Sequence, residues 1–153
     1  MKGTKGQHFR AGVVIVVRHP DLRRILAFER ADTSGSWQLP QGGLESGEEP
    51  IDAAWRELLE ETGLDEAHVL ARAEFPEWVA YEWPEDVIRE RGLDGGRRGQ
   101  VQKWFLFDAV NGDITPNPNG REFVAWRWVF PEWLVGHVVE WRRGAYERVL
   151  GTL

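Results

Sequence analysis

Three glutamates in the middle of the chain have the spacing of a metal-binding cluster. Glu57, Glu60 and Glu61 stand at i, i+3 and i+4, so on a helix their side chains share one face. Carboxylates this close repel one another by roughly 3 kcal/mol per pair at an effective dielectric near 20, and a cation removes that repulsion. Oxygen donors in a chain without cysteine favour Mg²⁺ or Mn²⁺ over zinc. For the glutamates alone, the alternative is a solvated acidic helix face.

The residues around the glutamates predict the helix that positions them. Apolar residues recur at helical spacing on the other side of the segment, at Ile51, Ala54, Trp55, Leu58 and Leu59. Pro50 suits the first turn, and Gly63 suits the end of the helix. Arg56 is expected to orient a carboxylate through a forked salt bridge. The alternative for Arg56 is an ordinary i, i+4 pair with Glu60.

Residues 42–64 as a whole resemble the signature of the Nudix hydrolases. Every fixed position of that signature is matched, namely Gly42, Glu48, Arg56, Glu57, Leu58, Glu60, Glu61, Gly63 and Leu64. The resemblance implies an α/β protein with a single-domain Nudix fold over residues 1–153, an α/β/α sandwich around a mixed β-sheet. It also implies hydrolysis of a phosphoanhydride bond with Mg²⁺, for which Mn²⁺ could substitute. No P-loop and no G-x-S-x-G motif competes with this interpretation.

The same resemblance implies roles for the residues of the site. Glu57, Glu60 and Glu61 would be metal ligands, with Gly42 contributing to the metal site and Arg56 to the catalytic group. One of these glutamates, or a glutamate from another loop, would act as the base. Glu122, just before a predicted strand, is the candidate for that outside glutamate and for a further metal ligand. Its alternative is a solvated loop carboxylate.

Motifs outside the signature resemble the RNA pyrophosphohydrolase and dinucleoside polyphosphate hydrolase branch of the family. They lie at residues 37–43, 99–105, 122–129 and 138–146. The implied substrate contacts are Arg30, Ser36 and Lys103 at phosphates or nucleotide, Tyr81 in the lining, and Val139 and Trp141 beside the terminal base. The alternatives are surface cations for Arg30 and Lys103 and core packing for Tyr81 and Trp141.

The substrate that this resemblance favours is the 5′-polyphosphate end of RNA. A dinucleoside polyphosphate such as diadenosine tetraphosphate is the alternative, because it presents the same phosphates and one base. A function of another class is a nucleotide-binding module without catalysis. Such a module is expected to lack a metal-binding glutamate, whereas all three are present here.

Composition sets further limits. The 153 residues fit one domain, and the net charge of −6 argues against broad electrostatic adhesion to nucleic acid. The absence of cysteine excludes disulfides, thiolate zinc sites and a cysteine nucleophile. The longest apolar run, residues 11–17, is too short to span a bilayer, and residues 1–10 lack the apolar core of a signal peptide. We therefore expect a cytoplasmic protein without a membrane partner, and the oligomeric state stays open.

Several further elements are needed to place these residues. Apolar and alternating patterns predict strands over residues 11–17, 25–28, 69–75, 78–83, 101–107 and 123–129. The first two strands are expected to form a hairpin. Helical spacing predicts a helix over residues 138–150, whereas residues 85–99 are expected to form a polar, arginine-bearing loop. Strands mixed with helices favour a sheet covered on both faces.

Overall fold

The computed structural model describes residues 8–90 and 96–153 and contains an eight-stranded sheet. Its two long strands, β1 (His8–Arg18) and β7 (Arg97–Ala109), pair in parallel along their length. The other pairs are antiparallel, in the order β3-β2-β1-β7-β5, with β4 on β1, β6 on β7 and β8 on β2. The remaining bounds are β2 Ile25–Arg30, β3 Trp37–Gln38, β4 Gln41–Gly43, β5 Val69–Glu74, β6 Val79–Glu82 and β8 Phe123–Val129. The expected mixed sheet is confirmed.

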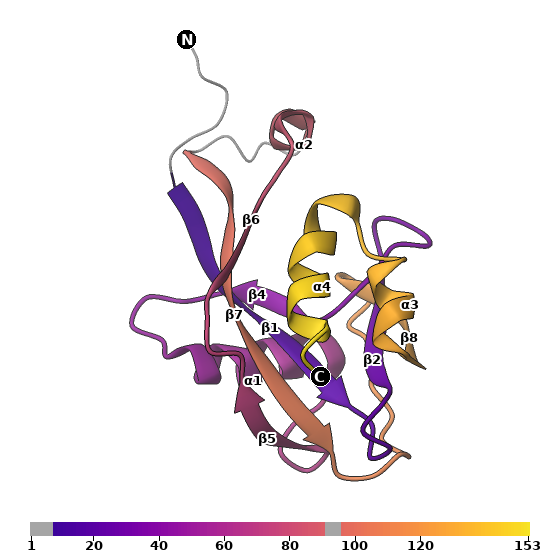
Figure 1. Ribbon diagram of the computed structural model, residues 1–153. Coiled ribbons are helices and arrows are strands. Elements are labelled where there is room, and N and C mark those ends of the chain that lie inside the picture. The colour runs from indigo at the N-terminus through magenta and orange to yellow at the C-terminus, as the bar shows by residue number, and fades with distance from the viewer. Residues whose placement is uncertain (1–7, 91–95) are drawn as a thin grey trace.

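Alternation along β1 divides the core into two layers. Val13, Ile15 and Val17 point into a cluster with the apolar face of α1 (Pro50–Thr62). Val14 and Val16 point into a second cluster, which contains residues of α3 (Pro131–Val135) and α4 (Arg143–Leu150). Helices therefore cover both faces of the sheet, and the α/β/α sandwich is confirmed (Figure 1).

Helix α1 has its expected bounds, but Leu59, expected on the apolar face, is 52% exposed because the buried face runs through Ala54 and Leu58 to Glu61. The helix begins at Pro50, and Gly63 caps it with a φ of 74°, a left-handed conformation that glycine adopts without a steric penalty. The backbone N–H of Gly63 donates to the carbonyl of Leu59 at 2.9 Å. The apolar face of α1 packs on the sheet, and the carboxylate face lies toward β4 and the loop before β8.

Two expectations about the other elements were wrong in detail. The C-terminal helix is shorter than expected, because a 3₁₀ turn at Glu140–Arg142 precedes α4. Residues 85–99 are not a plain loop, since Glu85–Glu90 form α2 and β7 begins at Arg97; residues 91–95 lie outside the described residues. The expected hairpin is confirmed by the antiparallel pair of Arg18 and Ile25; beyond it, β3 pairs along the same edge of β2, and β8 pairs along the other edge.

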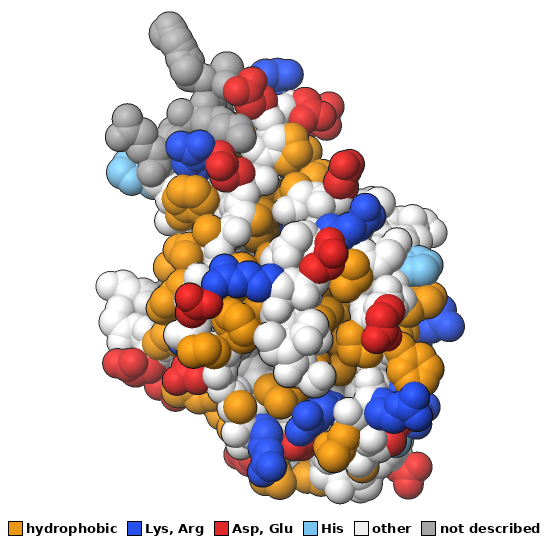
Figure 2. Space-filling view, viewed as in Figure 1, with side chains coloured by type: hydrophobic (Ala, Val, Ile, Leu, Met, Phe, Trp, Pro, Cys, Tyr) orange, Lys and Arg blue, Asp and Glu red, His pale blue; other side chains and the backbone are white. Residues whose placement is uncertain are grey.

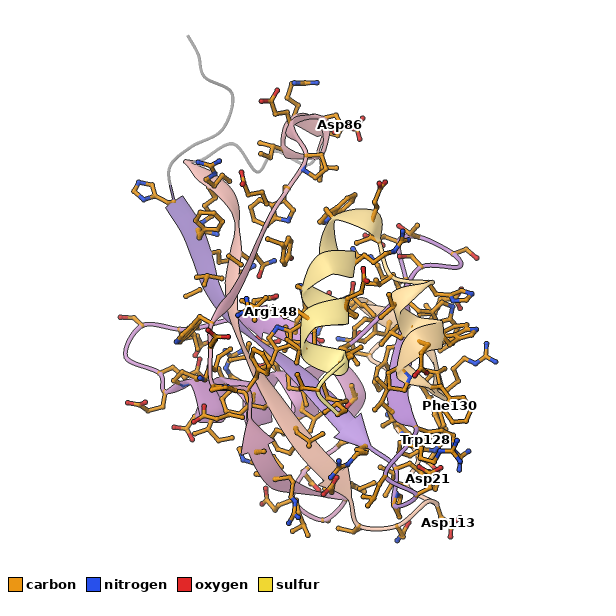
Figure 3. The ribbon with its side chains drawn as sticks, viewed as in Figure 1. Asp21, Asp86, Asp113, Trp128, Phe130 and Arg148 are labelled. Carbon is orange, nitrogen blue, oxygen red and sulfur yellow. The ribbon has the colours of Figure 1, made fainter. Side chains whose placement is uncertain are left out.

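An arm projects from one end of the sandwich. It consists of β6, α2 and the first residues of β1 and β7 (Figure 1). Tyr81, Trp83, Val87 and Ile88 form a small core inside it, against which Trp141 packs. Figure 3 shows Asp86 at this end and Asp113, in the β7–β8 connection, at the opposite end. Within the described ranges, no helix combines the length and the apolar character needed to cross a bilayer.

Candidate active site

The three glutamates of α1 differ in their exposure. Glu57 and Glu61 are 9% and 6% exposed, whereas the side chain of Glu60 is 57% exposed. The helix therefore carries two buried carboxyl groups at the base of the site and one at its rim. Buried carboxylates are costly unless a cation or hydrogen bonds compensate their charge.

Arg56 holds this carboxylate face together. Its Nε and Nη2 donate to the two carboxylate oxygens of Glu48, both at 2.8 Å, which is the expected forked geometry. Its Nη1 donates to Glu57 at 2.6 Å, and its Nη2 also donates to the carbonyl of Gly43 at 2.9 Å. The i, i+4 partner Glu60 is more distant, at 3.6 Å. The Arg56 hydrogen bonds hold the pKa of Glu48 down at about 2.

Glu61 lies in the opposite electrostatic situation. Burial and the adjacent Glu57 raise its pKa well above the usual range of a carboxyl group, and the more distant Glu122 acts in the same direction. The backbone N–H of Gln41 donates to Glu61 Oε1 at 3.2 Å and opposes this shift only in part. Without a cation, Glu61 therefore favours its protonated form.

Gly42 lies directly against Glu57. A Cβ atom at position 42 would lie 2.0 Å from Glu57 Cδ, so any larger residue must displace this carboxylate. The register of β4 with β1, which pairs Gly42 with Val13, fixes the glycine there. Gly42 thus allows the backbone of β4 to approach the carboxylate face of α1.

The loop before β8 brings Glu122 to the same site. Asn119 connects this loop to the end of α1, since its backbone N–H donates to the carbonyl of Glu61 at 3.3 Å. The Asn119 side-chain oxygen accepts hydrogen bonds from the N–H groups of Arg121 and Glu122, at 2.9 and 2.8 Å. Glu122 is exposed and lines the same cavity as the three glutamates of α1.

A cavity of about 410 Å³ lies between the carboxylates and a set of arginines. Its lining comprises Arg10, Arg30, Gln38, Gln41, Gly42, Gly43, Glu57, Glu60, Glu61, Trp83, Gln100, Glu122 and Arg142. The cavity therefore has an acidic wall from α1 and the Glu122 loop, and a basic wall from β1, β2 and the turn before α4. Such a pair of walls can hold cations and a polyphosphate side by side.

Gln38 joins two of the arginines. Its side-chain oxygen accepts hydrogen bonds from Arg30 at 2.7 Å and from Arg142 at 2.5 Å. Arg30 also makes a forked pair with Asp32, which raises the pKa of the guanidinium. Arg142 is only 7% exposed, and its hydrogen-bond partners among the described residues, Gln38 and Tyr81, are neutral. The basic wall thus contains a buried cation for which the described part of the chain supplies no acidic partner.

Four of the residues expected to contact substrate line a smaller recess of about 120 Å³, together with Thr33. They are Arg30, Ser36, Val139 and Trp141. Arg30 lines both spaces, so the recess opens beside the basic wall. Tyr81 lies behind that wall, buried, with its hydroxyl accepting from Arg142 at 3.1 Å.

Lys103 is placed apart from this group. On β7, Gln100 and Gln102 are buried on the side that faces β4, and Gln102 donates to the Gln41 side chain at 3.2 Å. Lys103 alternates to the opposite side, where its Nζ donates to the carbonyl of Pro76 at 3.2 Å. It lines a separate pocket near the start of α1.

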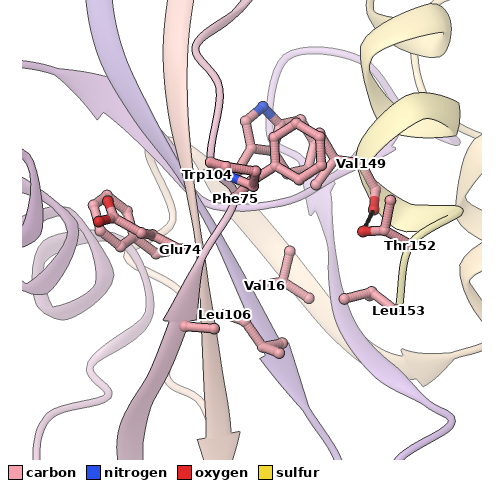
Figure 4. Close-up of a pocket in the computed structure, with 11 residues that line it drawn as sticks. Val16, Glu74, Phe75, Trp104, Leu106, Val149, Thr152 and Leu153 are labelled. Atoms are coloured by element: carbon pink, nitrogen blue, oxygen red, sulfur yellow. Dashed lines mark hydrogen bonds between the residues drawn. The ribbon is translucent and has the colours of Figure 1, made fainter.

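Two other parts of the described surface offer no competing site. The pocket in Figure 4, about 200 Å³, lies between β5, β7 and α4 and is lined mainly by apolar side chains such as Phe75, Trp104 and Leu106. Its lining offers no cluster of catalytic groups. The face shown in Figure 2 carries acidic and basic side chains interspersed, without a broad basic area, in keeping with the net charge of −6.

The carboxylates have the donor atoms that a divalent cation requires, but they are not arranged as a preformed binding site. Among the described residues, no three acidic or histidine side chains converge as a ready-made metal group. The reason is local, because Arg56 holds Glu57 and Glu60 points toward solvent. Buried Glu61, which has no cationic partner among the described residues, lies beside Glu57, and their carboxylate oxygens still suit a hard divalent ion.

Sequence reasoning missed part of the basic wall. Arg10 and Arg142 line the cavity, but neither was among the expected contacts. Arg142 lay inside the motif at residues 138–146, and its helical position on the same side as Tyr146 could have indicated burial. Arg10 had no comparable signal, because it lies at the edge of the predicted first strand.

With this geometry in place, comparison with known proteins identifies the class. The NUDIX domain model matches residues 8–149, and the chain therefore belongs to the Nudix family. Nudix hydrolases generally need divalent metal ions. The expected Nudix hydrolase of pyrophosphate bonds is confirmed by this match and by the relatives below.

Similar proteins include two bacterial RNA pyrophosphohydrolases. That of Cereibacter sphaeroides is 39% identical over 144 residues, covering 92% of this chain and 86% of the relative. That of Rhizobium meliloti is 43% identical over 137 residues, covering 83% and 80%. Nudix hydrolase 25 of Arabidopsis thaliana is 38% identical, covering 84% and 77%.

Two solved structures share the fold. The dihydroneopterin triphosphate pyrophosphohydrolase of E. coli has a TM-score of 0.74 at 21% identity and covers 96% of this chain and all of its own. An Ap4A hydrolase of C. elegans has a TM-score of 0.69 at 18% identity, covering 94% and 96%. At these identities the likeness shows the fold alone.

Proposed function

We propose that this chain is one Nudix domain over residues 1–153 that hydrolyses the 5′-polyphosphate end of RNA with Mg²⁺, or with Mn²⁺ in its place. Support comes from relatives named RNA pyrophosphohydrolase that are 39% and 43% identical over most of the chain. A cytoplasmic location accompanies this proposal, because transcripts are the substrate.

The main support for the proposal is that acidic and basic side chains face each other across one cavity. Among the described residues, buried Glu61 has no cationic partner and buried Arg142 has no acidic partner, whereas Glu57 pairs with Arg56. A metal-bound polyphosphate supplies the missing cation and the missing anion, because its metal ions face the carboxylates and its oxygens face the guanidinium groups. A site without such a ligand would leave both sets of charges uncompensated.

In this proposal Glu57, Glu60 and Glu61 hold the metal, with Glu122 and the Gly42 carbonyl as further oxygen donors. A bound divalent ion neutralises phosphate charge and lowers the pKa of water. The chain contributes the geometry. Arg56 fixes the carboxylate of Glu57, while Gly42 leaves room for it.

The basic wall orients the substrate. Arg30 and Arg142, joined through Gln38, receive phosphate oxygens, and Arg10 lies across the same cavity. The terminal base enters the recess between Ser36, Val139 and Trp141. Glu122 is exposed and lies on the loop before β8, apart from the glutamates of α1, and besides its metal contact it is proposed as the base that accepts a proton from the attacking water.

A dinucleoside polyphosphate is the second candidate. The observation that favours it is the recess of about 120 Å³, which offers space beside the phosphates for one base. Diadenosine tetraphosphate would place one base there and its phosphates along the basic wall. The two candidates differ in that only RNA continues from the first nucleotide into a strand.

The direct test of the proposal is product analysis. Purified protein is incubated with 5′-triphosphorylated RNA and Mg²⁺, and the ends are resolved by chromatography, with a chelator and Glu57→Gln as controls. We expect RNA with a 5′-monophosphate, formed only with metal and intact Glu57. Intact triphosphate ends under all conditions would contradict the proposal.

A further inference from the structure

A stacked group of aromatic and cationic side chains lies next to the base recess, on the edge between β8 and α3. It consists of Trp37, Arg127, Trp133 and His137, and is called the β8–α3 stack below. We propose that it binds the nucleotides that come after the terminal one in a single-stranded RNA. This inference rests on the proposed function and deepens it, since it selects RNA over a dinucleotide.

The indole of Trp133 is the centre of the stack. The imidazole of His137 lies parallel to it, with ring centroids 3.7 Å apart and an interplanar angle of 13°. The guanidinium of Arg127 lies 4.7 Å from the same indole centroid. One face of a ring cannot hold both groups, so they occupy opposite faces. Trp37 meets the indole edgewise at 5.6 Å.

A local hydrogen bond fixes the orientation of His137 in the stack. His137 Nδ1 lies 2.7 Å from the carbonyl oxygen of Trp133, and because a carbonyl only accepts, Nδ1 carries the proton. This bond keeps the imidazole parallel to the indole. Arg127 is also shared with Trp37, whose ring centroid is 5.7 Å from the guanidinium.

The stack is continuous with the base recess. Trp37 directly follows Ser36, and its backbone N–H donates to the carbonyl of His137 at 3.0 Å. Val139, which lines the recess, is two residues after His137. Two segments that line the recess therefore also contribute Trp37 and His137 to the stack, which places it within reach of a strand that continues from the recess.

The chemistry of the outer members fits a nucleic acid strand. Arg127 and His137 are exposed, whereas Trp37 and Trp133 are half-buried beneath them. A planar imidazole supported by an indole offers a surface on which a base stacks, and a guanidinium pairs with phosphate. With a net charge of −6, the chain needs such local contacts to hold RNA. Trp128 and Phe130 mark the same edge of the molecule in Figure 3.

The test uses substrate length. kcat/KM is measured with Mg²⁺ for 5′-triphosphorylated substrates of one, two, four and eight nucleotides with the same 5′ sequence. Wild type is compared with His137→Ala, with Arg127→Ala, and with Arg72→Ala, an exposed arginine on β5 at the other edge of the sheet. Thermal melting confirms that each variant is folded, and His137→Ala removes only an exposed side chain.

We expect kcat/KM of wild type to rise with length, and the ratio of long to short substrate to fall about fivefold or more in both stack variants. Arg72→Ala should keep the wild-type ratio. A ratio that persists in the folded stack variants, or equal rates at all lengths in wild type, would overturn this inference while RNA hydrolysis itself stands. Failure to cleave any RNA would overturn the proposed function as well.

Discussion

Two side chains in the cavity are buried without an oppositely charged partner among the described residues. Glu61 is buried beside Glu57, and Arg142 is buried with neutral partners among the described residues. Each is costly in the free protein and becomes favourable when metal and phosphate enter. Removing one of these charges should therefore weaken function without weakening the fold.

Glu61→Gln tests this at the acidic wall. We expect kcat/KM to fall at least about 100-fold, the order expected when a catalytic carboxylate is lost. Thermal stability without metal should be unchanged or higher, because a neutral amide replaces a carboxyl group whose charged form is disfavoured there. The measurements are initial rates with Mg²⁺ and melting in a chelator, with exposed Glu60→Gln as the control for melting. A large loss of stability with activity retained would refute the assignment.

Arg142→Met tests the basic wall. Losing a charge-assisted contact of about 1.5–3 kcal/mol should raise KM roughly ten- to hundredfold, while methionine fills the buried space without a charge. Melting should show little loss of stability, because removing the Arg142 guanidinium leaves no buried carboxylate unpaired among the described residues. Arg143→Met, the exposed neighbour, is the matched control. An unchanged KM would remove Arg142 from the substrate site.

Gly42→Ala tests the approach of β4 to α1. Its new Cβ would overlap the Glu57 carboxylate, at 2.0 Å from Cδ, so the carboxylate must move. A misplacement of about 1 Å can cost about 100-fold in rate, and we expect a loss of that order. Gly144→Ala is the control, because a Cβ there meets no atom within 4 Å. Equal activity of the two variants would show that the position of Glu57 is not critical.

Sequence spacing predicted the acidic wall better than the basic one. The three glutamates share one helix, so a single periodicity places them. Arg10, Arg30 and Arg142 come from three distant segments and meet only through the sheet and through Gln38. No local sequence pattern predicts that distant residues come together, so Arg10 and Arg142 were missed. Lys103 was expected at the substrate site, but the alternation of side chains along β7 places it on the opposite side of the sheet.

Among the elements, strands with strong apolar patterns were predicted within a few residues, and β8 matched its expected range. The elements missed were α2, α3, the 3₁₀ turn and the short strands β3 and β4, each at most six residues long. Helices this short depend on tertiary packing rather than on their own periodicity. Val87 and Ile88 of α2, for example, are buried only because β6 and Trp141 lie beneath them.

Tyr146 connects α4 to the site-forming strands and gives a prediction about pH. Its hydroxyl accepts from the N–H of Leu39 at 2.9 Å, and burial raises its pKa to about 12. The folded pKa exceeds the unfolded value of 10, so the neutral form stabilises the fold fully below pH 10. That contribution, of order 2–3 kcal/mol, is lost as pH rises from about 10 to 12.

Tyr146→Phe should remove this dependence. At neutral pH the variant should be about 1 kcal/mol less stable, because the Leu39 N–H loses its acceptor. Between about pH 10 and 12 the difference should shrink or reverse. Urea unfolding at several pH values measures both effects, and parallel pH curves for the two proteins would contradict the buried, neutral hydroxyl.

At the scale of the whole molecule, the sandwich brings one acidic helix and one basic wall to the two sides of a single cavity. The parallel pairing of β1 and β7 aligns Arg10 with Gln100, both in the cavity lining. The loop before β8 adds Glu122 to the cavity, and β8 itself, with β3 and the α3 region, carries the β8–α3 stack. We therefore expect substrate choice to depend on the groups that extend beyond the phosphates and the first base.

Competition between the two substrate candidates tests the proposed RNA specificity most directly. kcat/KM is determined with Mg²⁺ for an eight-nucleotide 5′-triphosphorylated RNA and for diadenosine tetraphosphate, and the products are identified by chromatography. We predict a clear preference for RNA, which is converted to a 5′-monophosphate end. A preference for the dinucleotide would contradict this specificity and would make the protein a hydrolase of dinucleoside polyphosphates.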